Sequence, residues 1–271
     1  MPRLSIIIVT YNSRSDVGGC LESLTRPGAV RTDHVILAVD NASPDGTAAS
    51  IRERWLGVTV IDAGANLGFA AANNLGIRQS FGEFVLLLNP DTVVPAGAID
   101  QLVAVLDSRG DAAVAGPRIV DASGRAELSY GRMISPLAEL RQKLLVVGND
   151  RGWPGIQSAV ERMTRRRKAV DWVSGACLLI RRADVEAVGL LDERYFMYTE
   201  DVDVCASVRA RGRRVLFEPA AEIVHLRGRS VATARRRTSS AYRRSQMAFY
   251  EKHHPRWAPA LRRYLKLRGK I

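Results

Sequence analysis

Residues 4–12 read LSIIIVTYN, in which a nearly continuous apolar run, residues 4–10, leads into the polar sequence Thr10-Tyr11-Asn12. Such a run is typical of a strand buried on both faces of a parallel sheet. Segments of helical composition separate it from three further runs of the same kind, at residues 34–39, 58–62 and 83–88. Strand and helix therefore alternate along the first part of the chain, which predicts an α/β fold with a doubly wound sheet flanked by helices.

The loops after these four strands are polar, and in doubly wound folds ligands bind at the carboxyl ends of the strands. Neither the dinucleotide-binding pattern G-x-G-x-x-G after the first strand nor a P-loop anywhere is found. A dinucleotide oxidoreductase and a P-loop nucleoside triphosphatase are therefore disfavoured. The loops contain Thr10-Tyr11-Asn12, Asp40-Asn41-Ala42-Ser43, Asn66-Leu67-Gly68-Phe69 and Asn89-Pro90-Asp91-Thr92.

The alternation of strand and helix changes after the fourth strand. Periodicity fades over residues 130–168, where Pro and Gly interrupt it, and we expect a mobile insertion there. Regular patterns return at residues 172–180, and a helix is predicted to begin near the acidic residues Glu200, Asp201 and Asp203. His225 follows a final short strand, so the expected catalytic domain covers residues 1–230.

The basic charge is concentrated in the tail. Residues 227–271 hold 14 Lys and Arg against one acidic residue, whereas the preceding 226 residues carry a net charge of −1. The tail, residues 231–271, is predicted to be helical, with an apolar stripe that includes Trp257 and Tyr264 opposite its basic residues. It is either a solvated face or a helix that binds an anionic membrane, where each Lys or Arg adds about 1 kcal/mol.

The cysteines and the apolar runs indicate where in the cell the protein resides. The three cysteines are far apart, which indicates neither a disulfide framework nor a zinc site. The apolar runs are much shorter than the roughly 20 residues that span a bilayer, and the start of the sequence lacks a signal-peptide pattern. A cytoplasmic protein is expected, and a tail that binds lipid would place it peripherally on the inner face of the plasma membrane.

Several residues have the chemistry for group transfer from a diphosphate. Asp91 follows a buried strand, where a carboxylate and phosphate oxygens could share Mg²⁺ or Mn²⁺, and His225 could complete that site. Asp201 and Asp203 lie in the first turn of a helix, where the dipole favours the ionised form, and a carboxylate there can act as a general base.

Seven motifs in order resemble those of glycosyltransferase family 2, and in particular its bacterial rhamnosyltransferase branch. The similarity runs from about residue 4 to residue 230. The motifs are Thr10-Tyr11-Asn12, Asp40-Asn41-Ala-Ser, Asn66-x-Gly68-Phe69 with Asn73-Asn74, Asn89-Pro90-Asp91, Trp172-Val-Ser-Gly175-Ala176, Glu200-Asp201-x-Asp203 and His225-x-Arg227.

This resemblance implies a GT-A fold and an inverting single displacement that depends on a divalent metal. It implies that Asp91 and His225 hold the metal and that Asp201 is the catalytic base. The residues that it places at the donor are Thr10, Tyr11, Asn12, Asp40, Asn66, Gly68, Asn89 and Arg227, with Arg229 as the alternative to Arg227 at the phosphates. Those that it places at the sugar or acceptor are Trp172, Gly175, Ala176, Glu200 and Asp203.

The sequence departs from many relatives at the metal motif, where the neutral Asn89 occupies the first position of Asp-x-Asp. A single carboxylate then anchors the cation, together with the donor's phosphates. The rhamnosyltransferase-like branch shares this form, which favours deoxythymidine-diphosphate (dTDP) rhamnose as donor and a glycan or lipid-linked sugar as acceptor.

Other functions are compatible with the separate motifs. Each motif alone could be an ordinary turn, helix start or core residue, and only their coincidence after strands favours an enzyme. A uridine-diphosphate (UDP) sugar could be the donor, since Asp40 cannot distinguish thymine from uracil. A catalytically inactive scaffold is a further alternative, and a nucleic-acid-binding protein is disfavoured by the neutral first 226 residues.

Overall fold

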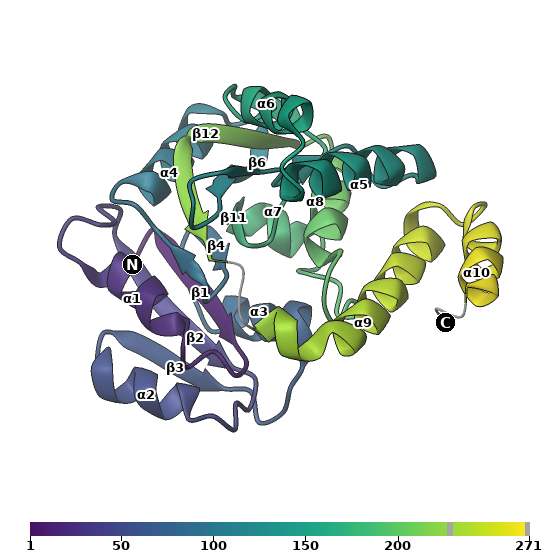
Figure 1. Ribbon diagram of the computed structural model, residues 1–271. Helices are drawn as coiled ribbons and strands as arrows, with labels where there is room; N and C mark the ends of the chain where they lie inside the picture. Colours follow the sequence, from purple (N-terminus) through teal and green to yellow (C-terminus); the bar gives the residue numbers. More distant parts are fainter. Residues whose placement is uncertain (227–229, 269–271) are drawn as a thin grey trace.

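The computed structural model describes residues 1–226 and 230–268, and for residues 230–240 it describes the backbone alone. A ten-stranded mixed sheet lies between two layers of helices (Figure 1). Its main path has the strand order β3-β2-β1-β4-β11-β6-β12-β5, β7 and β9 pair at its side, and β8 and β10 form a separate pair. The strands are β1 (Leu4–Thr10), β2 (His34–Asp40), β3 (Val58–Asp62), β4 (Phe84–Leu88), β5 (Thr92–Val93), β6 (Ala112–Val120), β7 (Ala126–Glu127), β8 (Tyr130–Gly131), β9 (Lys168–Val170), β10 (Trp172–Val173), β11 (Cys177–Arg181) and β12 (Arg214–His225).

The helices cover both faces of the sheet and extend beyond one end of it. They are α1 (Val17–Thr25), α2 (Thr47–Arg54), α3 (Gly68–Arg78), α4 (Ala98–Ser108), α5 (Pro136–Asp150), α6 (Pro154–Met163), α7 (Arg182–Ala187), α8 (Glu200–Ala210), α9 (Ser230–His253) and α10 (Ala258–Leu267). The described residues contain no helix that is long and apolar enough to cross a membrane.

The register of the sheet brings distant loops to one edge. Strand β1 pairs in parallel with both β2 and β4, so that Thr10 lies opposite Asp40. Strand β11 runs antiparallel to β4 and places Cys177, its first residue, opposite Leu88, the last residue of β4. The segment before β11 therefore lies at the carboxyl end of β4, on the same edge of the sheet as the ends of β1 and β2.

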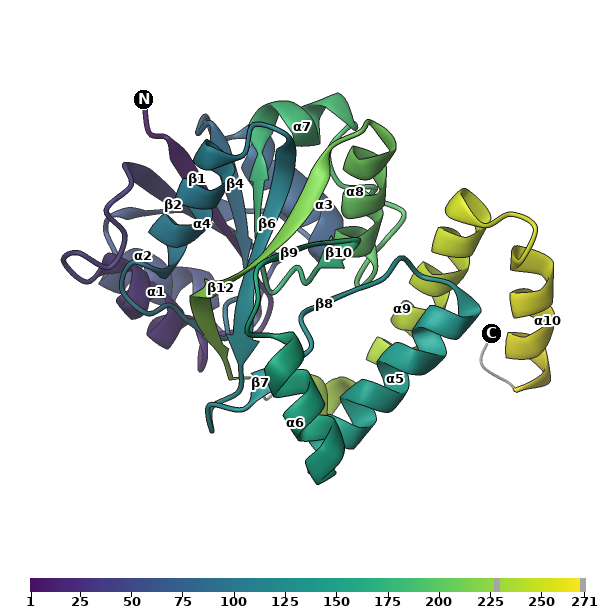
Figure 2. The same ribbon diagram turned by 90° about the horizontal axis from the view of Figure 1, so that it is seen from above.

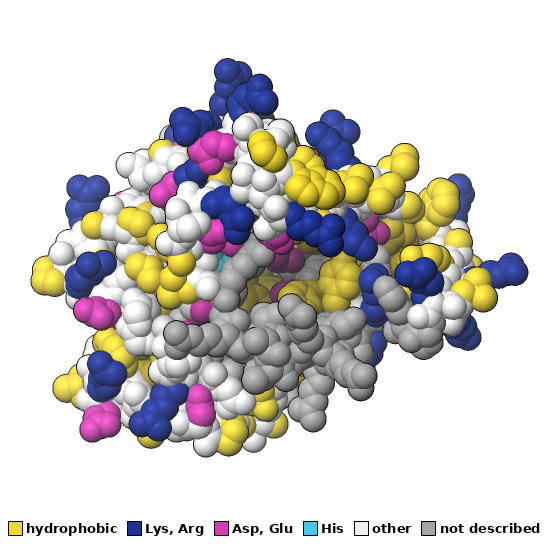
Figure 3. All heavy atoms as spheres, in the orientation of Figure 1, with side chains coloured by type: hydrophobic (Ala, Val, Ile, Leu, Met, Phe, Trp, Pro, Cys, Tyr) yellow, Lys and Arg dark blue, Asp and Glu magenta, His cyan; other side chains and the backbone are white. Residues whose placement is uncertain are grey.

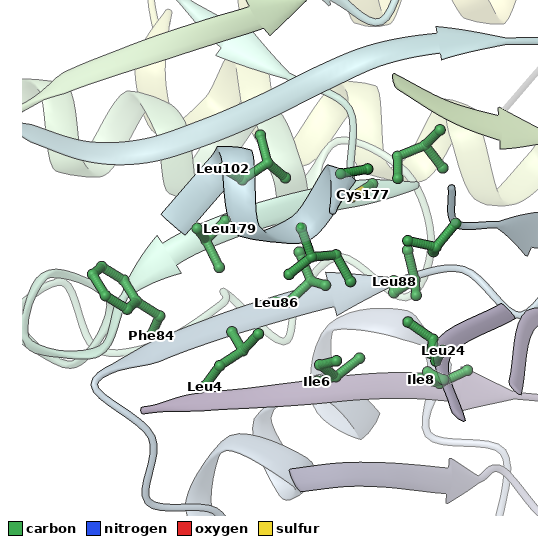
Figure 4. Close-up of a cluster of buried hydrophobic side chains, with 14 of the residues drawn as sticks. Leu4, Ile6, Ile8, Leu24, Phe84, Leu86, Leu88, Leu102, Cys177 and Leu179 are labelled. Atoms are coloured by element: carbon green, nitrogen blue, oxygen red, sulfur yellow. The ribbon is translucent and has the colours of Figure 1, made fainter. Parts of the chain in front are cut away.

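Two apolar cores hold the helices on the sheet. On one face, the even-numbered side chains of β1 and β4 pack with α1, α2 and α4, as Figure 4 shows for Ile6, Leu86 and Leu102. On the other face, Ile7 and Leu87 pack with α3, α7 and α8. Burying each such side chain contributes about 1.5–3 kcal/mol. The continuous apolar runs of β1 and β4 therefore reflect burial on both faces.

Residues 130–168 contain two helices, α5 and α6, that the fading periodicity did not reveal. The reason is that α5 exposes leucines and turns polar residues toward the protein, against the usual amphipathic rule. The final strand, β12, is 12 residues long rather than short. The predicted mobility of this insertion stays a prediction.

The tail is helical, as expected, and packs on the remainder of the chain. Phe249 and Tyr250 of α9 are buried with Tyr195 and Val202, and Leu265 of α10 joins the same cluster. Figure 2 shows α5, α9 and α10 together at one side of the molecule, and side-chain hydrogen bonds join α5 to α9. The tail is thus an integral part of the fold rather than a free basic arm.

Candidate active site

The ends of β1 and β2 form the first part of the site. The buried Asp40 carboxylate accepts hydrogen bonds from Thr10 Oγ1 at 2.9 Å and from Ser43 Oγ at 2.6 Å, and Ser43 N also donates to it. Asn12, which has a positive φ of 53°, donates its backbone N–H to Ser43 Oγ at 3.0 Å. Tyr11 remains 44% exposed beside them. These contacts hold two loops together at the predicted nucleoside position.

The second part joins β2 to the start of α3. Asn41 Nδ2 donates to the carbonyl oxygen of Gly68 at 3.1 Å, and Asn66 Oδ1 accepts from Gly68 N at 3.1 Å. Gly68 has a φ of +83°, and a Cβ there would lie 2.3 Å from the carbonyl oxygen of Phe196. Only glycine fits this position, because both its backbone conformation and the close approach of Phe196 exclude a side chain.

The third part is an acidic pair around His225 near the end of β4. His225 Nε2 lies 3.2 Å from Asp91 Oδ1, and His225 Nδ1 lies 3.6 Å from Glu127 Oε2 on β7. Burial lowers the pKa of His225, but Asp91 and Glu127 outweigh it and raise this pKa to about 9. The two carboxylates lie at opposite edges of the ring, so Asp91 can share an ion with His225 while Glu127 orients the ring.

The fourth part is the residue predicted to be the base. Asp201 Oδ2 accepts a hydrogen bond from Gly175 N at 2.8 Å, and Oδ1 accepts one from Val202 N at 2.8 Å. Burial raises the pKa of Asp201, although these backbone N–H groups act in the opposite direction. A carboxylate with a raised pKa is better suited to accept a proton near neutral pH.

Backbone contacts connect these parts. Asn89 N donates to the carbonyl oxygen of Ala176 at 2.9 Å, so the loop that carries Asp91 touches the segment that holds Asp201 through Gly175. Phe69 N donates to the carbonyl oxygen of Phe196 at 2.7 Å. The loop before α8 therefore also touches the Gly68 loop. The loops that carry Gly68 and Asp91 and the segments that carry Gly175 and Asp201 thus lie at one edge of the sheet.

Glu200 precedes Asp201 in the chain and is buried. Glu200 is 5% exposed, and its Oε2 atom has no hydrogen-bond partner among the described residues. Burial, reinforced by the charge of Asp201, raises the pKa of Glu200 well above its usual value. A neutral Glu200 can donate a hydrogen bond as well as accept one.

Two residues predicted near the acceptor are engaged elsewhere. Asp203 is 2% exposed and accepts from Tyr195 Oη at 3.1 Å, and its carboxylate pairs with Lys252 Nζ at 2.8 Å and His253 Nε2 at 2.6 Å. Its carboxylate thus faces α9 rather than the loop edge. Trp172 donates its indole N–H to the carbonyl oxygen of Arg132 at 2.8 Å and is half-buried.

Some predictions lie outside the structure, and some contacts were missed. Arg227, predicted to contact the donor, lies outside the described residues. Glu127 was not predicted, because no motif surrounds it and its place beside His225 arises from pairing between β6 and β7. Phe196 was not predicted either; its close approach explains Gly68, and the glycine itself was the available signal.

Comparison with protein families and curated proteins gives related enzymes. Residues 2–260 match the family described as Glycosyltransferase like family 2. An N-acetylglucosaminyl-diphospho-decaprenol L-rhamnosyltransferase of Mycobacterium tuberculosis is 31% identical over 99% of this chain and 90% of its own length. Rhamnosyltransferase WbbL of Escherichia coli is 23% identical over 81% of this chain and 82% of its own length.

Solved structures support the fold. A mannosyltransferase, PcManGT of Pyrobaculum calidifontis, in complex with GDP-Man and Mn²⁺, is similar with a TM-score of 0.61 and 18% identity, over 96% of this chain and 68% of its own. S. aureus TarS in complex with UDP has a TM-score of 0.58 and 16% identity, over 82% of this chain and 60% of its own. The predicted GT-A fold is confirmed.

Proposed function

The chain belongs to the family Glycosyltransferase like family 2 and is a glycosyltransferase, and from this we propose that it transfers L-rhamnose from dTDP-rhamnose to a hydroxyl of a lipid-linked sugar. The observation that carries the proposal is the contact between Asp201 and Gly175, next to the loop of Asp91. It allows one bound donor to be near both a metal-binding carboxylate and a base. The identity and coverage of the mycobacterial rhamnosyltransferase support the choice of sugar.

The donor would occupy the loops at the carboxyl ends of β1, β2 and β4. Asp40 is already oriented by Thr10 and Ser43, and it would accept a hydrogen bond from the base or ribose. Tyr11 is exposed enough to cover a nucleoside. The other residues proposed at the donor are Asn12, Asn66, Gly68, Asn89 and Arg227.

The residues at the end of β4 fit a divalent cation bound together with a diphosphate. Asp91 and His225 point toward one another, and the carboxylate of Asp91 is the kind of oxygen ligand that Mg²⁺ or Mn²⁺ prefers. His225 would join as a ligand only after Nε2 gives up the proton that it shares with Asp91. No group of three or more His, Cys, Asp or Glu side chains in the described part of the chain is placed to hold an ion, so donor phosphates would supply ligands. When bound, the ion neutralises charge on the leaving diphosphate.

Asp201 would accept the proton of the acceptor hydroxyl as its oxygen attacks the anomeric carbon. The new C–O bond forms as the bond to the diphosphate breaks, which inverts the configuration. Gly175 N holds the carboxylate in place through Oδ2. Burial raises the pKa of Glu200 and so favours its neutral form, which would donate a hydrogen bond to a hydroxyl of the sugar or acceptor. Ala176 and the ring of Trp172 would also lie on the acceptor side.

The acceptor and the tail lead to a proposed location. A sugar on a polyprenyl diphosphate keeps the reaction at a membrane, and we propose the cytoplasmic face of the plasma membrane. Trp257 and Tyr264 are 57% and 52% exposed, as a membrane contact of the tail requires. The variant Arg262→Gln/Arg263→Gln should then bind anionic vesicles more weakly than the wild-type protein.

The donor is tested by supplying a panel of nucleotide sugars with Mg²⁺ or Mn²⁺ and measuring release of nucleoside diphosphate. Acceptor-stimulated release from dTDP-rhamnose alone supports the proposal. Release from a UDP-sugar instead would contradict the proposed donor, and no release from any donor, with N-acetylglucosaminyl-diphospho-polyprenol present, would contradict the proposed reaction. Asp201→Asn serves as the control for contaminating activity.

A further inference from the structure

Helix α5 exposes its apolar side and directs its polar side toward the protein. Leu137, Leu140 and Leu144 are spaced three and four residues apart, so they lie on one face of the helix. They are 82%, 57% and 54% exposed. A surface helix normally has the opposite arrangement, with leucines toward the core.

Specific hydrogen bonds fix this orientation. Glu139 accepts from Gln246 Nε2 at 2.6 Å and from Tyr250 Oη at 2.7 Å, both on α9. Near the other end of the helix, the buried Asn149 donates to the carbonyl oxygen of Ala126 at 2.9 Å. The helix cannot rotate to bury its leucines without breaking these contacts, so the leucines stay outward.

The outward face is also basic. Arg141 lies four residues after Leu137 on the same face, and Trp153, just beyond the helix, is 46% exposed. Lys143 is a second exposed cation on α5. Residues 132–168 hold nine Lys and Arg against three acidic residues, although Arg165, Arg167 and Lys168 lie beyond α5 and are paired within the protein. Figure 3 shows hydrophobic side chains gathered over α5 with Lys and Arg next to them.

We propose that this leucine face of α5, defined by Leu137, Leu140 and Leu144, binds the surface of an anionic lipid bilayer. Leucines and a tryptophan would enter the interface while the basic side chains pair with lipid headgroups, as in interfacial amphipathic helices. A second copy of the chain is a poorer occupant, because two faces of the same positive charge repel one another.

The tail offers a second contact near the same side of the molecule. Figure 2 shows α10 beyond α9, on the side where α5 lies. Leu267 of α10 is 79% exposed, and α10 also carries Arg262, Arg263 and Lys266. If α5 binds the bilayer, the insertion of residues 130–168 contacts the membrane as well as the tail. This proposal rests on the proposed function, because a lipid-linked acceptor is the reason for the protein to bind a membrane.

The test is co-sedimentation of the full-length protein with vesicles of phosphatidylcholine, with and without phosphatidylglycerol. The variant Leu137→Ser/Leu140→Ser/Leu144→Ser should bind the anionic vesicles about tenfold or more weakly than the wild-type protein. Leu56→Ser is the matched control, because Leu56 is 91% exposed and lies far from α5 in the sequence, between α2 and β3. It should bind as the wild-type protein does.

Several outcomes would overturn the proposal. Equal binding by the triple variant, or equal binding of the wild-type protein to neutral and anionic vesicles, excludes this face as an anionic-lipid site. A wild-type dimer in light scattering that becomes a monomer in the triple variant assigns the face to a second copy. Donor-dependent release of nucleoside diphosphate without vesicles should be unchanged in the variant; if it is absent in both proteins, the proposed function fails while the binding result stands.

Discussion

Replacing Asp203 by Asn should destabilise the protein by releasing α9 from α8. The carboxylate is 2% exposed and pairs with Lys252 and His253, whose side chains keep 29% and 22% of their surface exposed. Breaking a buried pair costs about 3–5 kcal/mol. Because both partners reach solvent, we expect a lower cost, about 2–3 kcal/mol. Each kcal/mol lowers the melting temperature of a domain of this size by about 2–4 °C, so thermal unfolding should shift down by about 4–12 °C.

The exposed Asp33 provides the control, since Asp33→Asn should leave the melting temperature within about 1 °C of the wild-type value. Thermal unfolding is followed by circular dichroism, together with the Michaelis constant for the acceptor. If Asp203→Asn kept the wild-type melting temperature but raised the Michaelis constant for the acceptor, the proposed role of Asp203 in holding α9 would be refuted. It would support instead the contact between Asp203 and the acceptor that the resemblance implies.

Three further perturbations follow from the geometry. Glu127→Gln removes the carboxylate beside the His225 imidazole. Binding of Mn²⁺ together with a nucleoside diphosphate, measured by calorimetry, should weaken about tenfold. An unchanged affinity would contradict the role of Glu127 in orienting His225. Gly68→Ala meets the Phe196 carbonyl oxygen and should lower the free energy of unfolding in urea by about 2–4 kcal/mol, whereas Gly124→Ala, with a φ of +80° but open space, should lose only about 1–2 kcal/mol. Equal losses would show that the close contact adds nothing. Burial raises the pKa of Asp201, and the proposed base acts in its ionised form. Turnover should therefore fall as the pH decreases through a value above the ordinary pKa of an aspartate. A pH–rate profile that falls only at the ordinary pKa of an aspartate would contradict this.

The sheet could be predicted well from the sequence because its strands are buried on both faces. The run of residues 4–10 is strand β1 at the same bounds, and the run of residues 58–62 is β3. Burial on both faces produces continuous apolar stretches that a sequence reveals directly. The loops after β1, β2 and β4 meet at one edge because the carboxyl ends of parallel strands lie together. That rule does not account for Gly175, which precedes the antiparallel β11, or for Asp201, which lies at the start of α8.

Other features depend on long-range contacts that local patterns do not encode. Helix α5 escaped prediction because its leucines face outward and Glu139 is held by α9, more than 100 residues later in the chain. The role of Asp203 was hidden for the same reason, since Lys252 and His253 come from the tail. Glu127 reaches His225 only through pairing within the sheet.

The central claim is that Asp201 removes the acceptor proton while the diphosphate is held near Asp91. The most direct measurement compares transfer of rhamnose from dTDP-rhamnose to N-acetylglucosaminyl-diphospho-polyprenol by the wild-type protein and by Asp201→Asn, alongside binding of dTDP with Mn²⁺. The account predicts that Asp201→Asn loses transfer by about 1,000-fold or more, with nucleotide binding within about twofold of the wild-type protein. Transfer at the wild-type rate in Asp201→Asn would contradict it.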